Sequence, residues 1–148
     1  MRRLPAFCLI LLAALCAAPA FAAEKAGDPG TNVEMPFLIA PMSKDGKLLG
    51  YAYISSKLVA TSQRAALEIR GKIAFIQDAF VRDVNAASIA TGADPTVADP
   101  KLLALRLVAD ARRVIGAAKV SRIIFGDGDQ DPGIVFSPLH QTKTPEKP

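Results

Sequence analysis

The chain has very little of the chemistry that most enzymes need. Its 148 residues include no tryptophan, one histidine and two cysteines, and aromatic residues make up 6% of it. A metal site built from several histidines or cysteines, and a nucleophile–histidine–carboxylate triad, each require residue types that are too scarce here. We therefore expect one small domain that is not an enzyme and holds no cofactor.

The first 22 residues have the composition of a secretory signal peptide. Two arginines precede an apolar stretch at positions 4–18, and a small-x-small sequence ends at Ala22. This order of charged, apolar and small residues predicts export and cleavage between Ala22 and Ala23. Both cysteines, Cys8 and Cys16, would leave with the leader. The mature protein could then form no disulfide, and its stability would depend on packing.

An uncleaved membrane anchor is the alternative interpretation of the leader. Positions 4–23 are 20 consecutive uncharged residues. At ~1.5 Å per residue they are about long enough to span a hydrocarbon core of ~30 Å. In both cases we expect the domain in the periplasm, free if the leader is cleaved and attached to the inner membrane if it is not.

The charge balance does not favour nucleic-acid binding. The chain carries 18 basic and 14 acidic residues. The leader holds two of the basic residues and no acidic one, so 18 − 2 = 16 basic residues face 14 acidic ones in the mature chain. These lysines and arginines are spread along the sequence and are not interleaved with aromatic residues. We expect no nucleic acid among the partners.

Hydrophobic patterning predicts a first strand after a polar linker at residues 23–32. The strand covers residues 33–42, which are mostly apolar. It contains Pro36 and Pro41, and proline cannot donate a hydrogen bond to a neighbouring strand. We therefore expect this strand to lie at an edge or to be broken.

A hairpin into a second strand is predicted next. Asp45-Gly46 is a strong turn signal between apolar runs, and the second strand covers residues 48–61. Tyr51 and Tyr53 share one face of this strand because side chains alternate along it. They form either a cross-strand packing pair or a binding patch.

A long helix follows, with Ser62 as its N-cap and its end near residue 85. Its apolar stripe recurs at spacings of three and four and comprises Ala66, Ile69, Ile73, Ile76, Phe80 and Val84. Gly71 lies in mid-helix, where glycine costs roughly 1 kcal/mol relative to alanine, so we expect a neighbour to pack close to it. Phe75 lies opposite the stripe. We expect either a loop or another protein surface to cover its ring.

Residues 86–100 form a loop rich in small residues before a second helix. Asp99-Pro100 supplies an N-cap with proline at the first helical position, and the helix is expected to end near residue 118. A short β-branched strand follows at residues 120–125. Three charged residues of the helix lie away from its apolar stripe: Arg106, Asp110 and Arg113.

Together these elements predict an α+β fold. A small antiparallel sheet carries two helices packed on one face, within a domain at residues 33–133. Residues 134–148 end in a polar, proline-containing segment, and we expect this tail to be disordered.

The sequence GDGDQDPG carries the clearest candidate site. It places Asp127, Asp129 and Asp131 at alternate positions, like the first three ligands of a calcium-binding loop. The match then fails, because Pro132 stands where glycine is needed and Pro138 where a bidentate glutamate should close the site. Two interpretations stay open: a weak ion- or ligand-binding module, or a turn in which Asp and Gly have local conformational roles.

Several stretches resemble the flagellar basal-body-associated FliL family. They are an apolar strand NVEMPFLI, a hairpin into LLGYAYISSKLV, the helix EIRGKIAFIQDAF and, after a second helix, the strand KVSRIIF before an acidic turn. Glu68-Ile69-Arg70, followed by Ile73 and Ile76, is similar to the family's charged helix, in which an Ile-Arg pair opens an apolar repeat. The likeness covers about residues 33–128.

The resemblance implies a stomatin-like periplasmic domain without catalytic activity. It implies a scaffold that self-associates into a homo-oligomer around flagellar motor stators, or a relative that supports another envelope complex. The implied partners are further copies of the chain and inner-membrane proteins, the flagellar stator among them. Phe75, with Gly71 beside it, then becomes the candidate contact between subunits.

Intact-mass analysis of the protein from a fractionated native host tests the interpretation of the leader. We expect a soluble species that begins at Ala23, because the small-x-small sequence is a cleavage signal. A species that begins at Met1 in the inner-membrane fraction would show an anchor instead.

Overall fold

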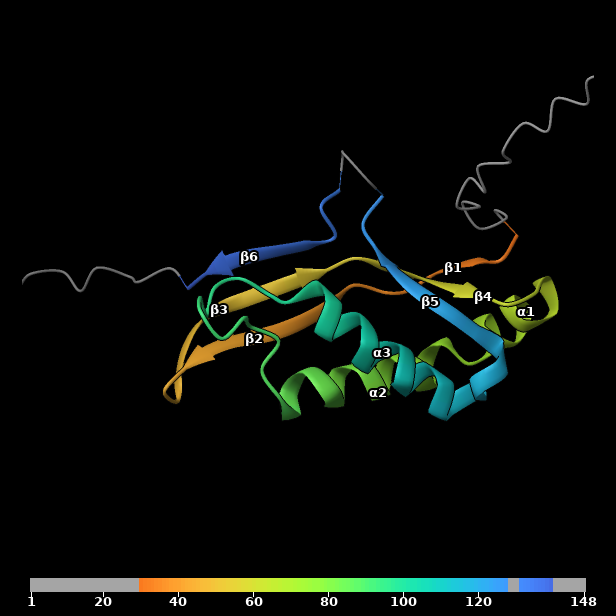
Figure 1. Cartoon of the computed structure of the whole chain (residues 1–148), viewed down its shortest axis with the longest axis horizontal. Helices are drawn as coiled ribbons and strands as arrows, with labels where there is room; N and C mark the ends of the chain where they lie inside the picture. Colours follow the sequence, from red (N-terminus) through yellow and green to blue (C-terminus); the bar gives the residue numbers. More distant parts are fainter. Residues whose placement is uncertain (1–29, 128–130, 140–148) are drawn as a thin grey trace, which may run out of the picture.

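The computed structural model describes residues 30–127 and 131–139 (Figure 1). The leader with Ala22 and Ala23, most of the predicted linker, Asp129 and residues 140–148 lie outside these ranges. Within the two ranges, none of the helices combines the length and the apolar character that crossing a membrane requires.

The strands of the described residues form two three-stranded antiparallel sheets that lie end to end (Figure 1). The strand order of each sheet follows from the hydrogen-bonded pairs. One sheet has the order β1 (Asn32–Glu34), β4 (Ser56–Ala60), β5 (Val120–Phe125), and the other has the order β2 (Leu38–Lys44), β3 (Lys47–Ile54), β6 (Ile134–Pro138). Because β1 leads into β2, β3 into β4 and β5 into β6, the two sheets form one long ribbon with a joint in its middle.

The joint divides both strands that the sequence predicted as continuous. Residues 35–37 interrupt the first one and Ser55 interrupts the second. Pro36 has no N–H to donate, so the ladder of the first strand stops there, as expected for a broken strand. At Ser55 the central strand changes neighbours, from β2 and β6 to β1 and β5. Such a change depends on distant segments and leaves no signal in the local pattern.

The predicted hairpin is confirmed. Lys44 pairs with Lys47, which leaves Asp45 and Gly46 as a two-residue loop. Both have positive φ, 51° and 75°, as a type I′ turn requires.

Two helices occupy the segment that the sequence predicted as one. They are α1 (Gln63–Gly71) and α2 (Ile73–Ala86). Ser62 caps α1 as expected, since its Oγ accepts from the N–H of Ala65 at 3.1 Å. The break falls at Lys72, whose N–H donates three residues back to Ile69 instead of four. Gly71 favours such an interruption because glycine stabilises a helix poorly.

The helix α3 (Pro100–Ile115) begins where the sequence predicted it. Oδ1 of Asp99 accepts from the N–H groups of Lys101 and Leu102, both at 3.0 Å. The helix ends three residues earlier than expected, because Gly116 takes a φ of 106° and residues Ala117–Lys119 form a 3₁₀ turn.

Near the end of α3, Arg112 covers part of the outer edge of β5. Its Nε donates to the carbonyl of Val120, and its Nη2 donates to the carbonyl of Ser121, both at 3.1 Å. These carbonyls are therefore bound by a side chain at the edge of the sheet.

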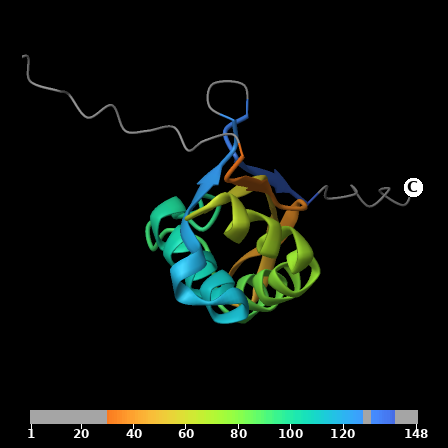
Figure 2. The same ribbon diagram turned by 90° about the vertical axis from the view of Figure 1, so that its right-hand side faces the viewer.

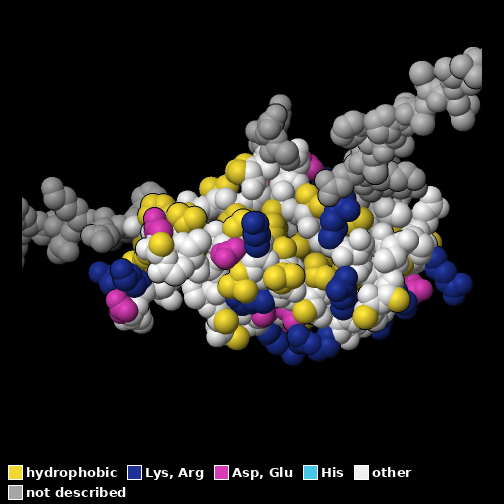
Figure 3. All heavy atoms as spheres, in the orientation of Figure 1, with side chains coloured by type: hydrophobic (Ala, Val, Ile, Leu, Met, Phe, Trp, Pro, Cys, Tyr) yellow, Lys and Arg dark blue, Asp and Glu magenta, His cyan; other side chains and the backbone are white. Residues whose placement is uncertain are grey.

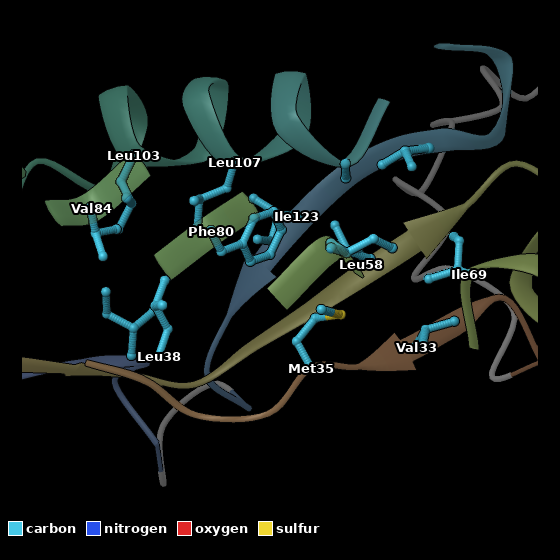
Figure 4. Packing of buried hydrophobic residues seen from close by; sticks show 14 of the residues in the cluster. Val33, Met35, Leu38, Leu58, Ile69, Phe80, Val84, Leu103, Leu107 and Ile123 are labelled. Atoms are coloured by element: carbon cyan, nitrogen blue, oxygen red, sulfur yellow. The ribbon is translucent and has the colours of Figure 1, made fainter. Parts of the chain in front are cut away.

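The helices lie on one side of the strands, and no helix of residues 30–127 or 131–139 lies on the other side (Figure 2). Phe80 from α2 is fully buried at the centre of the core, beside Leu107 from α3 and Ile123 from β5 (Figure 4). The same cluster includes the inward residues of β2 and β3, namely Leu38, Ala40, Met42, Ala52 and Ile54. The predicted α+β class, with helices packed on one face of an antiparallel sheet, is confirmed.

The predicted disorder of residues 134–148 is wrong for its first part. Ile134–Pro138 forms β6, which pairs with β3 over five residues. Space for it is provided by Gly50, because a Cβ there would lie 2.2 Å from the carbonyl oxygen of Ser137 and 2.8 Å from the Phe136 ring. The folded domain therefore extends beyond the predicted boundary at residue 133. At its start Asn32, assigned to the linker, belongs to β1.

Truncating Phe80 tests the central position of its ring. We expect Phe80→Ala to lower the free energy of unfolding by about 3–5 kcal/mol, because it removes a fully buried ring and leaves a cavity. The neighbouring Val81→Ala, at an exposed position, should change it by less than about 0.5 kcal/mol. Urea denaturation measures both, and equal losses would contradict the packing shown in Figure 4.

Candidate functional site

The acidic turn between β5 and β6 is held by groups of the protein itself. Asp131 accepts a hydrogen bond from Oγ of Ser55 at 2.5 Å and another from the N–H of Gly133 at 2.8 Å. These two donors, the serine hydroxyl first, lower the pKa of Asp131. Its carboxylate thus fixes the loop to the joint of the sheet.

Asp127 has a protein partner as well. Its Oδ1 accepts from Nζ of Lys57, whose Nζ also lies 3.3 Å from Oε1 of Glu34 on the neighbouring strand. The pKa of Lys57 is raised, chiefly by the hydrogen bond to Asp127. Lys57 is therefore a charged, paired cation.

The two candidate ligands that the structure describes have different protein partners. Asp127 binds Lys57 and Asp131 binds Ser55, while Asp129 lies outside the described residues. Within those residues, no group of three or more histidine, cysteine, aspartate or glutamate side chains could hold a metal ion. The described contacts support the interpretation of the segment as a structural turn.

A shallow cleft of about 180 Å³ lies at the joint. Ser55, Lys57 and Asp131 line it, and Phe37 at its rim is 74% exposed. The serine hydroxyl donates to a carboxylate, and the lysine is paired with two others. The pKa of Asp131 is lowered, so its carboxylate is a weak base for Ser55, and the pKa of Lys57 is raised, whereas a nucleophilic lysine needs a lowered one.

The helical pattern predicts Asp110 away from the apolar stripe, whereas the structure buries this side chain between α2 and α3. Oδ1 of Asp110 lies 2.8 Å from Nη2 of Arg113, while its Oδ2 has no hydrogen-bond partner among the described residues. Burial raises the pKa of Asp110, and the charge of Asp83 adds to the effect. A clue in the sequence is its position next to Ala111 and three residues after Leu107, both of which belong to the stripe.

Arg106 fastens the same pair of helices. Its guanidinium binds Oδ2 of Asp83 at 2.9 Å and also donates to three carbonyls at the end of α2, those of Asp83, Ala87 and Ser88. This arginine satisfies carbonyl groups that a helix end leaves without partners. Its function is structural, which explains why its side chain is mostly buried.

Phe75 is the most prominent apolar side chain on α2 that the core does not use. Its ring is 63% exposed, and Nζ of Lys72 lies 5.2 Å from the ring centroid. No loop within the described ranges covers the ring. Of the two expectations for Phe75, a loop or another protein surface, the first is therefore wrong for these residues. The expectation that a neighbour packs close to Gly71 is wrong for the described residues, because none of their atoms outside the adjoining helix backbone lies within 4 Å of the position of a Cβ there. Gly71 ends α1 on its solvent side.

The face of the sheet opposite the helices is also apolar and exposed. Ile39, Tyr53 and Val135 form one row across β2, β3 and β6, and Tyr51 lies in the next row opposite Pro41. Tyr51 is 36% exposed and Tyr53 is 44% exposed. The tyrosines thus have cross-strand neighbours, as the packing interpretation requires, and still present their rings to solvent.

Comparisons with known proteins identify no family. No family model matches the chain, and no curated protein matches it. The fold class rests on the structure, whereas the resemblance to the FliL family rests on the sequence pattern alone.

Because of the Ser55–Asp131 contact, the stability of the folded protein should depend on pH. Because the pKa of Asp131 is lowered in the folded protein, its contribution to stability is present above the ordinary aspartate range and is lost as the pH falls through the lowered value. We expect Ser55→Ala to be less stable than the parent at pH 7 and the difference to narrow in acid. Urea denaturation at both pH values measures it.

Ser121→Ala serves as the matched control, since Ser121 is exposed on β5. It should leave stability unchanged at both pH values. A Ser55→Ala deficit of the same size at neutral and acidic pH would show that the Asp131 carboxylate is not the partner that matters.

Proposed function

We propose that the protein is a non-enzymatic accessory or scaffold domain that acts by contact with protein surfaces, first of all with further copies of itself. The observation that carries the proposal is Phe75, a large aromatic side chain that is 63% exposed on a well-formed helix. An aromatic ring in this position contributes nothing to the core. Aromatic residues, phenylalanine included, are enriched at the centres of protein interfaces.

The surroundings of Phe75 suit a helix-to-protein contact. Leu67 on α1 and Phe75 on α2 lie on either side of the break in the sequence, and Leu67 is 66% exposed. The open space at Gly71, which ends α1, gives a partner backbone room to approach. We call this surface, made of Leu67, Gly71 and Phe75, the α1–α2 face.

The polar groups at the joint of the sheet support a role without catalysis. Ser55, Lys57, Asp127 and Asp131 are engaged with one another across the base of the loop. Each of these contacts ties one segment of the sheet to another. The ion-binding alternative gains no support from them, because it needs the same carboxylates that these donors occupy.

The finer proposal is a stomatin-like, FliL-like domain in the periplasm. The leader supports export, and the order of strand, hairpin, helix, helix and strand along residues 33–128 supports the likeness. On this proposal the α1–α2 face assembles a homo-oligomer beside a flagellar motor stator or another inner-membrane complex, as part of flagellar motility or of another envelope function.

Charge reversal at the α1–α2 face tests the proposal. We expect Phe75→Glu to shift the exported protein toward the monomer in sedimentation velocity, because a carboxylate would have to be buried in the contact. Leu105→Glu is the control, since Leu105 is 72% exposed on α3 and outside the α1–α2 face. An unchanged oligomer size in Phe75→Glu would exclude this surface as the contact.

Gly71→Ala tests whether Gly71 lies in the contact between copies or is only exposed to solvent. Alanine should stabilise α1 by up to about 1 kcal/mol. If a partner backbone approaches Gly71, the same substitution weakens self-association. A more stable protein with a smaller oligomer supports close approach, and a more stable protein with an unchanged oligomer removes Gly71 from the interface.

A further inference from the structure

The outermost strand of one sheet, β6, has an open edge. It pairs with β3 on one side, and no strand of the described ranges pairs with its other side (Figure 1). The carbonyl of Gly133 accepts from the N–H of Ser55, and the N–H of Leu139 donates to a carbonyl of β3. Backbone groups of alternate residues in a strand point to the same side. Odd-numbered residues of β6 therefore bond to β3, whereas Ile134 and Phe136 direct their N–H and C=O groups outward.

Prolines limit the length of this open edge. Pro132 precedes β6 and Pro138 ends it, and neither has an N–H to donate. The donors of the edge are therefore the N–H groups of Ile134 and Phe136. If a longer strand paired with this edge, its carbonyl groups opposite the two prolines would find no N–H donor. A partner strand that also offers only two N–H groups between two prolines leaves no such carbonyl unpaired.

Both faces of the sheet are apolar beside this edge. On the outer face, Val135 is 50% exposed at the end of the row that it forms with Tyr53 and Ile39. On the inner face, Ile134 and Phe136 border a groove of about 340 Å³. No charged residue lines it; the other lining residues are Met42, Ala52, Thr96, Val97, Ala98, Pro100 and Pro132. Hydrophobic side chains gather over β6 and α3 in Figure 3.

We propose that β6 pairs antiparallel with β6 of a second copy of this chain, across a two-fold axis at Val135. Ile134 of each copy then lies opposite Phe136 of the other, and each such pair exchanges both hydrogen bonds. Every outward N–H group of both strands is thereby used. The contact is isologous, as the interface of a closed dimer must be.

The same two-fold rotation also brings apolar side chains of the two copies together. Val135 meets Val135 of the second copy on the outer face, which joins two rows of Ile39, Tyr53 and Val135 into one. On the inner face Ile134 packs against Phe136 of the other copy and extends the apolar groove of each. This inference rests on the proposed function, because it specifies a second self-contact beside the α1–α2 face.

A single cysteine at the axis tests the pairing. Opposite residues of a non-hydrogen-bonded antiparallel pair have Cα atoms about 4.5 Å apart, within the ~4.4–6.8 Å range of disulfides. We expect Val135→Cys, in a full-length Cys8→Ser, Cys16→Ser background, to form a disulfide-linked dimer on mild oxidation. Ile39→Cys is the matched control, because Ile39 is 49% exposed in the same row but two strands away from the axis. It should stay largely uncrosslinked.

Charge substitution supplies a second measurement that does not depend on oxidation. Val135→Lys places two like charges opposite each other, and we expect the dissociation constant of the dimer to rise by up to about fivefold at low salt. Val135→Glu should have the same effect. In an equimolar mixture of the two variants, Lys and Glu lie opposite each other and the dimer should form again. Unfolded variants would not regain the dimer on mixing. Sedimentation velocity measures all three.

The outcomes separate this pairing from the proposed function. Equal crosslinking of the two cysteine variants, or an unchanged dimer in Val135→Lys, overturns the β6 pairing. If Phe75→Glu still reduces the oligomer in that case, self-association through the α1–α2 face stands alone. A parent protein that stays monomeric over the whole concentration range and does not crosslink overturns both.

Discussion

Ser55 is the residue on which the continuity of the sheet depends. Its N–H donates to Gly133, its carbonyl accepts from Gly126, and its hydroxyl donates to Asp131. The chain therefore leaves the sheet after β5 beside Ser55 and returns to it, before β6, beside the same residue. As a result, β5 and β6 continue one line, and the helices pack against a surface that extends over both sheets.

This closure requires glycine at both ends of the loop. Gly126 and Gly133 have φ values of 68° and 78°. A Cβ on Gly126 would lie 1.9 Å from the carbonyl oxygen of Asp131, and one on Gly133 would lie 2.4 Å from the nitrogen of Gly126. No side chain fits at these distances. The loop can close on Ser55 because neither position carries a side chain.

Elements with local determinants could be predicted from the sequence, and elements that depend on distant partners could not. Asp99 caps its own helix, and Asp45-Gly46 defines a turn of two residues, so that both leave a signal in the sequence itself. By contrast, β6 exists because β3 pairs with it and Gly50 leaves room for Phe136. The exposure of Phe75 followed from the stripe of its helix. The burial of Asp110 depends on how α2 packs against α3, which no helical pattern contains.

The candidate site divides in the same way. The spacing of Asp127 and Asp131 could be read directly, but their partners are Lys57 and Ser55, which lie 70 and 76 residues away in the sequence. Spacing specifies which oxygens share a loop, and the fold determines which donors reach them.

The guanidinium of Arg112, which binds the carbonyls of Val120 and Ser121, has a consequence for solubility. An open strand edge is a template on which further chains can add without limit, and side chains that occupy its carbonyls remove that template. Pro41 has a comparable effect in β2, since it supplies no N–H to a neighbouring strand. Two potential growth points of the sheet are thus restricted by ordinary side chains. A domain without disulfides can in this way keep exposed apolar rows and resist polymerising into fibrils.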